Sequence, residues 1–142
     1  MKQIVVATDA STAARSAVDV GIALAGSVGA AVRLVHVLAP PDWEERGTPR
    51  RSLSPEEEHA IHRAEAHAAE RGVALEVELL PLEGSAAETI AGHAGRLDAD
   101  VIVVGSRGRS GLGVAVLGSV AQGVVHNSRR PVLVVPAGAT MG

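Results

Sequence analysis

The sequence predicts a single α/β domain over residues 1–142, built as a doubly wound sheet of five parallel strands with helices on both faces. Short apolar segments rich in valine and isoleucine alternate with segments of helical periodicity along the chain, which is typical of parallel strands joined by crossover helices. A chain of 142 residues is long enough for one domain with a full core. Trp43 is the only aromatic residue, so the core must be aliphatic, which suits a parallel sheet covered by helices.

The first strand is predicted over Ile4–Thr8, a run that is apolar up to its last residue. Asp9–Thr12 supply residues typical of helix caps. The helix that follows keeps its apolar residues on one face: Ala14, Val18, Ile22 and Ala25. Gly26 and Gly29 are expected to end this helix, and Ala31–Leu38 forms the second strand.

The next segment, Pro40–Leu53, is rich in proline, arginine and glutamate and is predicted to be a loop. It leads into Ser54-Pro55-Glu56-Glu57. A hydroxyl cap, a proline in the first turn and a glutamate at the third position together indicate the start of a helix. We expect this helix to run to about Arg71, where a glycine follows and stops it.

Val73–Leu80 alternates apolar residues with glutamates, which predicts a half-exposed strand at the edge of the sheet. Ser85 and Glu88 are spaced as a second capping box and open a helix that extends to about Leu97. The last three elements are expected to be a strand, a helix and a strand: Val101–Val104, Ala115–Asn127 and Pro131–Pro136.

A glycine motif follows the fourth predicted strand. The chain reads Gly105-Ser106-Arg107-Gly108, then nine residues, then Gly118-Ser119. Glycines allow a phosphate to approach the backbone closely, because no Cβ is in the way, and the N–H groups at the start of the next helix point toward negative charge. Further cationic and hydroxyl groups lie within the motif: Arg107, Arg109 and Ser110. The motif therefore predicts a phosphate cradle for a nucleotide.

Composition excludes several classes of protein. The formal net charge is −3 and no long run of lysine and arginine occurs, so general nucleic-acid binding is not expected. The absence of cysteine excludes disulfides and thiolate metal sites. No apolar run approaches the ~20 residues of a membrane span, and the N-terminus lacks the apolar core of a signal peptide. We expect a cytoplasmic protein that does not bind membranes.

Three other phosphate-handling classes fit the sequence poorly. A P-loop requires a lysine after its glycines, whereas the only lysine is Lys2. A dinucleotide-binding domain requires G-x-G-x-x-G after the first strand, where this chain has Asp9-Ala10-Ser11. A phosphoacceptor receiver domain requires an aspartate at the end of its third strand, which here reads Leu79-Leu80-Pro81.

The glycine motif, in its strand–loop–helix setting, resembles the universal stress protein family and, within it, the branch that binds ATP. The resemblance extends over essentially the whole chain. It includes these segments: Ile4-Val5-Val6-Ala7-Thr8-Asp9, His36-Val37, Ala99-Asp100 and Arg130-Pro131-Val132-Leu133-Val134-Val135-Pro136. It implies a five-stranded parallel sheet in the order 3-2-1-4-5, and a homodimer formed through the last strand, Val132–Val135, whose edge would be exposed.

The resemblance also implies roles for individual residues. Asp9 would lie by the ribose and phosphates, where it could act through Mg²⁺ or Mn²⁺. Ala7 and Thr8 would line the floor of the pocket, and Val37 would hold the adenine through its backbone. The residues expected around the ribose and phosphates are Gly105, Ser106, Gly108, Gly118, Ser119 and Val120. Arg107 and Arg109 would either screen the triphosphate charge or lie in solvent.

The function implied is that of an ATP-binding module that regulates a protein partner, not identifiable from sequence, in a stress response. Two alternatives stay open: a slow Mg-dependent ATPase, and a protein that binds AMP or a cyclic nucleotide. Phosphoryl transfer requires a positioned charge and a positioned water. The sequence offers Asp9 and the arginines but no evident residue to orient the water, so binding is favoured and any hydrolysis should be feeble.

Several candidate residues also have structural interpretations. Asp9 can cap the first helix as well as contact a ligand. His36 is expected to be a packed core residue in preference to a catalytic base, and Trp43 is expected to fill an apolar gap. Acidic and histidine side chains gather on one predicted helix, where a solvated face is favoured over a metal site: Glu58, His59, His62, Glu65 and His67.

Overall fold

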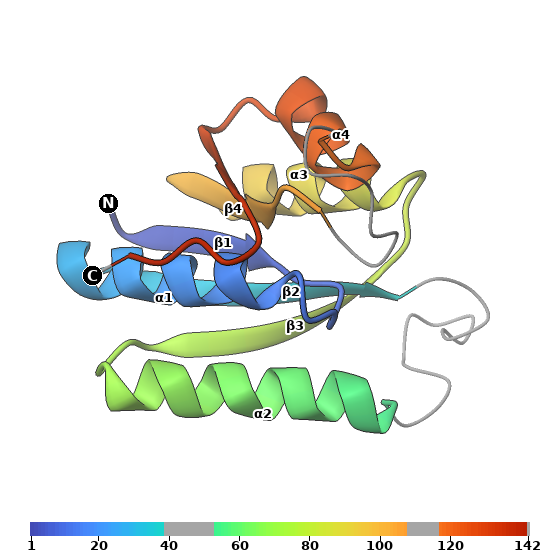
Figure 1. Cartoon of the computed structure of the whole chain (residues 1–142). Helices are drawn as coiled ribbons and strands as arrows, with labels where there is room; N and C mark the ends of the chain where they lie inside the picture. Colours follow the sequence, from blue (N-terminus) through green and yellow to red (C-terminus); the bar gives the residue numbers. More distant parts are fainter. Residues whose placement is uncertain (39–52, 108–116, 142) are drawn as a thin grey trace.

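The computed structural model describes residues 1–38, 53–107 and 117–141. Five parallel strands form one sheet in the order β3-β2-β1-β4-β5, which confirms the predicted fold class and strand order (Figure 1). The strands are β1 (Gln3–Ala7), β2 (Ala31–Leu38), β3 (Leu75–Pro81), β4 (Val101–Gly105) and β5 (Val132–Val135). Four helices connect them: α1 (Arg15–Val28), α2 (Pro55–Glu70), α3 (Ala86–Arg96) and α4 (Ser119–Asn127).

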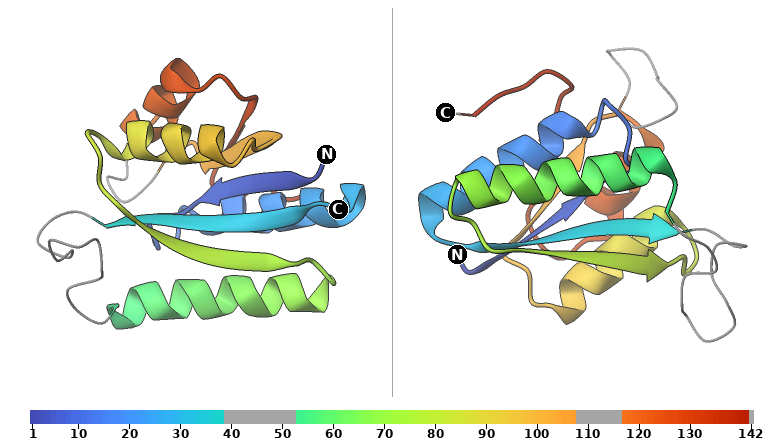
Figure 2. Two further views of the ribbon diagram at one scale, coloured as in Figure 1. Left: turned by 180° about the vertical axis from the view of Figure 1, so that it is seen from behind. Right: turned by 90° about the horizontal axis from the view of Figure 1, so that it is seen from below.

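The helices cover the two faces of the sheet in pairs. Helices α1 and α2 contact each other on one face, and α3 and α4 contact each other on the opposite face (Figure 2). Side chains of β1 alternate between the two resulting cores, so that Ile4 and Val6 pack on the α1 side and Val5 on the α3 side. Both faces of β1 are therefore buried, which explains why it reads as an uninterrupted apolar run.

Strand β3 lies at one edge of the sheet, as its alternating sequence predicts. Its glutamates pair with a cation on the neighbouring strand: the Arg33 guanidinium lies 2.8 Å from the carboxylate of Glu78 and 3.2 Å from that of Glu76. A carboxylate also joins the central strands, because Asp100 accepts hydrogen bonds from the backbone N–H groups of Lys2 and Gln3, at 2.6 and 2.9 Å. These contacts fix the starts of β1 and β4 side by side.

The predicted capping box is complete at α2, whereas at α3 the structure shows its serine half. The Ser54 hydroxyl accepts from the Glu57 N–H, and the Glu57 carboxylate accepts from the Ser54 N–H, so the capping box is complete. At α3, the Ser85 hydroxyl accepts from the Glu88 N–H at 3.1 Å. Both helices therefore begin where a serine satisfies a backbone N–H that has no partner within the helix.

The predicted start of α1 is wrong, and of the two glycines expected to end the helix only Gly29 does so. The residue before the helix is Ala14, which provides no side-chain cap, because Asp9 and Ser11 use their oxygens within the preceding turn. The helix also continues past Gly26 to Val28 and ends at Gly29, which has φ 72°. Of Gly26 and Gly29, only Gly29 adopts the left-handed conformation that terminates helices.

Helix α4 also begins later than predicted. Leu117 and Gly118 are not helical, and the first helical residue is Ser119. The backbone N–H of Gly118 donates to the carbonyl of Ser106 at 2.7 Å, which holds Gly118 in an extended conformation, φ −63° and ψ 157°. The part of the predicted helix before Leu117 lies outside the described residues.

Glycine allows α1 to pack closely against the sheet. A Cβ added at Gly21 would lie 2.5 Å from a γ-methyl of Val6, whereas one added at Gly26 would lie 3.5 Å from its nearest neighbour, Val73. Helix α1 therefore approaches β1 at Gly21 more closely than any other residue type allows.

Candidate functional site

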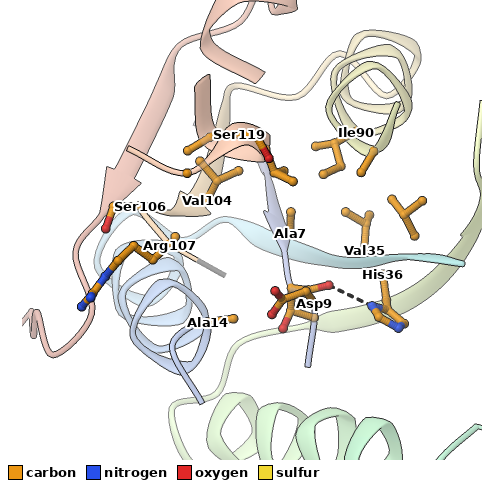
Figure 3. A pocket seen from close by; sticks show the side chains of 17 residues that line it. Ala7, Asp9, Ala14, Val35, His36, Ile90, Val104, Ser106, Arg107 and Ser119 are labelled. Atoms are coloured by element: carbon orange, nitrogen blue, oxygen red, sulfur yellow. Dashed lines mark hydrogen bonds between the residues drawn. The ribbon is translucent and has the colours of Figure 1, made fainter. Parts of the chain in front are cut away.

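A cavity of about 290 Å³ opens at the carboxyl ends of β1, β2 and β4 (Figure 3). This is the place where open α/β sheets bind ligands, because connections leave neighbouring strands toward opposite faces. The cavity is lined by Ala7, Thr8, Asp9, Ala14, Val35, His36, Val37, Ala86, Ile90, Val104, Gly105, Ser106, Arg107, Gly118, Ser119, Val120 and Ala121.

One part of the cavity is apolar. The ends of the strands contribute Ala7, Val35 and Val104, and α3 contributes Ala86 and Ile90. Figure 3 shows the side chains of Ile90 and Val35 directed into the cavity. Aliphatic walls of this kind accept a flat, weakly polar ring and exclude water from it.

Polar side chains line the other part of the cavity. Asp9 follows the end of β1, Ser106 and Arg107 follow the end of β4, and Ser119 begins α4. The Arg107 guanidinium extends away from the centre of the cavity, and the Ser119 side chain lies on the opposite wall from Asp9 (Figure 3). Hydroxyl and charged groups at one end and aliphatic groups at the other match a ligand with a polar tail and an apolar head.

The turn that carries Asp9 has an unusual backbone. Asp9 Oδ1 accepts from the Ser11 N–H at 2.9 Å, and Thr8 Oγ1 accepts from the Ala10 N–H at 3.1 Å. Ala10 lies between them with φ 67°, a left-handed conformation that costs a non-glycine residue about 1 kcal/mol or more. The chain thus turns sharply out of β1 directly after Thr8, which places Asp9 at the cavity in place of a further strand residue.

The backbone of β2 continues beyond the end of β1. Odd-numbered residues of β2 direct their N–H and C=O groups toward β1, as shown by Ala31 N–H bonding to the Lys2 carbonyl at 2.9 Å and by Thr8 N–H bonding to the Val35 carbonyl at 3.0 Å. Val37, the next odd residue, therefore presents one donor and one acceptor to the space beyond β1. Among the described residues, no backbone carbonyl at the end of β1 accepts a hydrogen bond from the Val37 N–H.

The start of α4 offers further donors. Gly118 precedes the helix and has no side chain to cap it. Its own N–H is bonded to Ser106 and its carbonyl accepts from Gln122 at 3.0 Å. The N–H groups of the first helical residues, Ser119 and Val120 among them, therefore lack partners within the helix, and both residues line the cavity.

Gly105 and Gly118, the two glycines of the motif within the described residues, make close contacts with the chain around them. A Cβ at Gly105 would lie 3.0 Å from the Arg107 carbonyl oxygen, and a Cβ at Gly118 would lie 3.1 Å from the Ser106 carbonyl oxygen. Neither glycine has a positive φ. Their role is thus to make room beside the backbone of Ser106 and Arg107, not to permit an unusual backbone conformation.

His36 and Glu57 form a buried pair beneath the cavity. The His36 Nδ1 lies 2.9 Å from the Thr8 carbonyl oxygen, and Nε2 lies 2.7 Å from Glu57 Oε2. Both residues are more than nine-tenths buried, which confirms the prediction that His36 is a packed core residue. Burial alone would raise the pKa of Glu57, but hydrogen bonds from Ser54 and His36 outweigh it and lower the pKa from 4.5 to about 2.

The lowered pKa of Glu57 predicts a loss of stability in acid. A carboxyl group whose pKa is depressed by folding stabilises the protein above its unfolded pKa, and this contribution is lost as the pH falls from 4.5 toward about 2. Between about pH 6 and about pH 3, wild-type protein should lose about 2 kcal/mol more stability than the Glu57→Gln variant. Urea unfolding at the two pH values measures this difference, and equal losses in both proteins would contradict it.

All the predicted site residues within the described ranges line the one cavity: Ala7, Thr8, Asp9, Val37, Gly105, Ser106, Arg107, Gly118, Ser119 and Val120. Their contacts with a ligand stay a prediction. Gly108, Arg109 and Ser110 lie outside the described residues. So does the predicted loop Pro40–Leu53, which contains Trp43, except for its last residue, Leu53. Asp9 is not the cap of α1, since that position is Ala14.

The sequence interpretation missed part of the wall. The additional lining residues are Ala14, Val35, His36, Ala86, Ile90, Val104 and Ala121. Ala86 and Ile90 follow the edge strand β3, and only the crossing of α3 over the opposite face brings them to the cavity. A spacing of four residues at the start of a helix was the available signal, but it is shared by every amphipathic helix.

The histidine-rich face of α2 does not assemble a metal site. Within residues 1–38, 53–107 and 117–141, no three histidine, aspartate or glutamate side chains are grouped to hold an ion. His67 instead faces Asp19 of α1 at 4.0 Å, and Arg63 pairs with the same carboxylate at 2.8 Å. In the same ranges, no helix combines the length and the apolar character needed to cross a bilayer.

Comparisons with known proteins agree with the architecture. The profile of the universal stress protein family matches residues 1–136. Universal stress protein MJ0531 from Methanocaldococcus jannaschii is 34% identical over 94% of this chain and 81% of its own length. A universal stress protein solved in complex with cAMP is 25% identical, with a TM-score of 0.70 over 96% of this chain and 98% of its own. A universal stress protein from Archaeoglobus fulgidus, solved in complex with dAMP, is also 25% identical, with a TM-score of 0.70 over 94% and 97% of the two chains.

Proposed function

Because the chain belongs to the universal stress protein family, we propose that it binds an adenine nucleotide in the cavity at the carboxyl ends of β1, β2 and β4 and acts as a nucleotide-responsive regulatory module. The nucleotide proposed first is ATP with Mg²⁺ or Mn²⁺, ahead of AMP and cyclic forms. The module would act in the cytoplasm on a protein partner, as part of a stress response. Relatives of the same fold crystallised with cAMP and dAMP support the choice of adenine.

The observation that carries this proposal is the pairing of two backbone features in one cavity. The N–H and C=O of Val37 lie at one end, and the N–H groups at the start of α4 lie at the other. Adenine presents a donor at N6 and an acceptor at N1, which complement a backbone C=O and N–H. Guanine presents an acceptor at O6 and a donor at N1, which would oppose like groups.

The polar end of the cavity fits a phosphate group. Gly105 and Gly118 line this end and let the backbone around Ser106 and Arg107 pack closely, because a Cβ at either glycine would crowd a carbonyl oxygen there. The N-terminus of α4 adds a positive dipole. Asp9 supplies one carboxylate, and Mg²⁺ typically binds one or two carboxylates together with substrate phosphates. A bound divalent ion would neutralise the negative charge that a triphosphate places next to Asp9.

Binding is favoured over hydrolysis. The only lysine, Lys2, precedes β1 and so lies at the amino ends of the strands, whereas the cavity lies at their carboxyl ends. Among the cavity-lining residues, Asp9 is the one carboxylate and His36 directs its ring away from the cavity (Figure 3). A water molecule in line with a terminal phosphate would therefore have few described groups to orient it.

A homodimer through β5 is part of the proposal. β5 lies at the edge of the sheet opposite β3, so its outer N–H and C=O groups have no strand partner among the residues that the structure describes. The sequence Val132–Val135 carries no charge or proline, the features by which natural edge strands commonly avoid pairing. A second copy of the same strand would satisfy these groups.

Calorimetry tests the proposed function. With Mg²⁺ present, ATP or AMP should bind at least tenfold tighter than the matching guanine nucleotide, because of the opposed groups at Val37. Phosphate release measured in the same samples should be negligible over the time of the titration. Absence of binding by every adenine nucleotide at roughly millimolar concentration would overturn the proposal, and rapid turnover abolished by Asp9→Asn would replace it with an ATPase.

A further inference from the structure

The end of β1 departs from the regular parallel ladder at one residue. In such a ladder, a residue donates its N–H to one residue of the neighbouring strand and accepts at its carbonyl from the residue two positions further on. Thr8 fulfils the first half, because its N–H donates to the Val35 carbonyl at 3.0 Å. Its carbonyl should then accept from the Val37 N–H. It lies instead 2.9 Å from Nδ1 of His36.

The next rung of the ladder is also missing. The Ala10 N–H would be the donor to the Val37 carbonyl, but it donates to Thr8 Oγ1 at 3.1 Å, and the left-handed Ala10 turns the chain away. Both strand partners of Val37 are therefore engaged elsewhere. The Thr8 carbonyl is hydrogen-bonded to the His36 ring, and the Ala10 N–H donates to the Thr8 hydroxyl.

The His36 ring is fixed at its other end by a buried carboxylate. Glu57 Oε2 lies 2.7 Å from Nε2, while Oε1 of the same group accepts from the Ser54 N–H at 2.9 Å. Since Glu57 belongs to the first turn of α2, a series of hydrogen bonds runs from the end of β1 through His36 to the start of α2. The ring is thus held at both nitrogens, at Nδ1 by the Thr8 carbonyl and at Nε2 by the Glu57 carboxylate.

We propose that His36 is the specificity-positioning residue of the nucleotide site: by holding the Thr8 carbonyl, it withdraws that carbonyl from the Val37 N–H and keeps the N–H available for the base. Glu57 holds the ring in place for this task. The inference rests on the proposed function for its ligand, but the arrangement of backbone partners that it describes belongs to the ligand-free protein. His36 itself does not touch the nucleotide, and acts through the backbone of its neighbour.

The alternative is that His36 only fills space and balances the charge of Glu57. The two roles predict different behaviour of one amide. If His36 diverts the Thr8 carbonyl, removing its Nδ1 donor should let the carbonyl return to the ladder and pair with the Val37 N–H. If His36 is merely structural, the Val37 N–H should be unaffected by the loss of that donor.

A matched set of variants separates these roles. Glu57→Gln serves as the background, because a glutamine can donate to Nε2 while still accepting from Ser54, and no buried carboxylate is left without a partner when His36 is changed. In this background, His36→Phe removes both ring donors and keeps the planar bulk. His36→Asn retains an N–H donor close to the position of Nδ1 and serves as the conservative control.

Amide hydrogen exchange of the ligand-free proteins is the first measurement. The Val37 amide should exchange rapidly in the Glu57→Gln background and with His36→Asn, and at least tenfold more slowly with His36→Phe, because it then pairs with Thr8. Unchanged exchange at Val37 in a folded His36→Phe variant would overturn the inference. If His36→Phe does not fold, slow exchange at Val37 with His36→Asn or in wild type would overturn it instead.

Calorimetry with AMP and GMP is the second measurement. AMP affinity should fall about tenfold with His36→Phe and stay within about twofold with His36→Asn, and the preference for AMP over GMP should fall in parallel, since one matched hydrogen bond is lost. Equal losses for AMP and GMP would overturn the role in specificity. Failure of wild type to bind AMP would count against the proposed function and leave the exchange result to decide the role of His36.

Discussion

Replacing Gly118 with valine should weaken adenine-nucleotide binding by about a hundredfold or more, equivalent to about 3 kcal/mol, while the fold survives. A Cβ at this position lies 3.1 Å from the Ser106 carbonyl oxygen and 3.6 Å from the Arg107 Cα. Both contacts are with the backbone of residues that line the cavity, so this backbone would have to shift by a few tenths of an ångström to admit the valine. We expect the shift to displace the groups beside the start of α4, where a phosphate is expected, without unfolding the sheet.

The backbone conformation does not explain this effect, since φ −63° and ψ 157° at Gly118 suit any residue. Gly95→Val is the matched control, because Gly95 is exposed on α3 and a Cβ there meets nothing within 4 Å. Calorimetry with ATP and AMP measures affinity, and circular dichroism verifies the fold. A folded Gly118→Val protein with wild-type affinity would show that the cradle is not where the phosphate binds.

Replacing Gly21 with alanine should lower stability by about 2 kcal/mol, and the melting temperature by about 6 °C. The new methyl group would lie 2.5 Å from a γ-methyl of Val6, which is fully buried and β-branched and so cannot rotate away. Helix α1 would have to move outward from β1, opening space in the core on that face.

Gly26→Ala in the same helix should have the opposite sign. Its Cβ meets only ordinary van der Waals contact, at 3.5 Å from Val73, and alanine favours a helix over glycine by up to about 1 kcal/mol. Thermal unfolding of Gly21→Ala and Gly26→Ala measures the two changes in stability, and the chemical change is the same at both sites. Equal effects would mean that the close approach of α1 to β1 is not a constraint on stability.

The fold could be predicted from the sequence because the strands at the centre of the sheet, β1 and β4, are short apolar runs rich in β-branched residues, as at Val101–Val104. Such runs are buried on both faces in the structure, and Ile102 and Val103 are fully inaccessible to solvent. The edge position of β3 was equally visible, since its glutamates alternate with apolar residues. In these elements local pattern and tertiary environment agree.

The start of α4 could not be placed from the sequence. Residues before Ser119 carry no signal against a helix other than a glycine, and the extended conformation of Gly118 depends on a hydrogen bond to Ser106, twelve residues earlier. The same limit applies at α1, where Asp9 and Ser11 are residue types that commonly cap helices. Their side-chain oxygens instead accept hydrogen bonds within the turn that precedes the helix. Competition between equivalent hydrogen bonds is decided by tertiary geometry.

The site was predictable where backbone motifs define it, and not where packing does. The glycines and Asp9 follow strand ends, and strand ends meet in a doubly wound sheet. The pairing of His36 with Glu57 was hidden, because Glu57 already had a complete explanation as part of a capping box. One carboxylate performs both tasks with its two oxygens, and no spacing rule links residues 36 and 57.

Helices α1 and α4 have no side-chain caps, in contrast to the serines that begin α2 and α3, so binding of the proposed nucleotide would be linked to folding. An anion at the N-terminus of α4 would accept hydrogen bonds from the first N–H groups of that helix, as the Ser54 hydroxyl accepts from Glu57 at α2. The bound nucleotide would then serve as the cap of α4. At a free concentration one hundred times the dissociation constant, such a ligand adds about 2.7 kcal/mol to the stability of a protein. The resistance of this chain to heat and proteolysis would then rise and fall with the nucleotide supply around it.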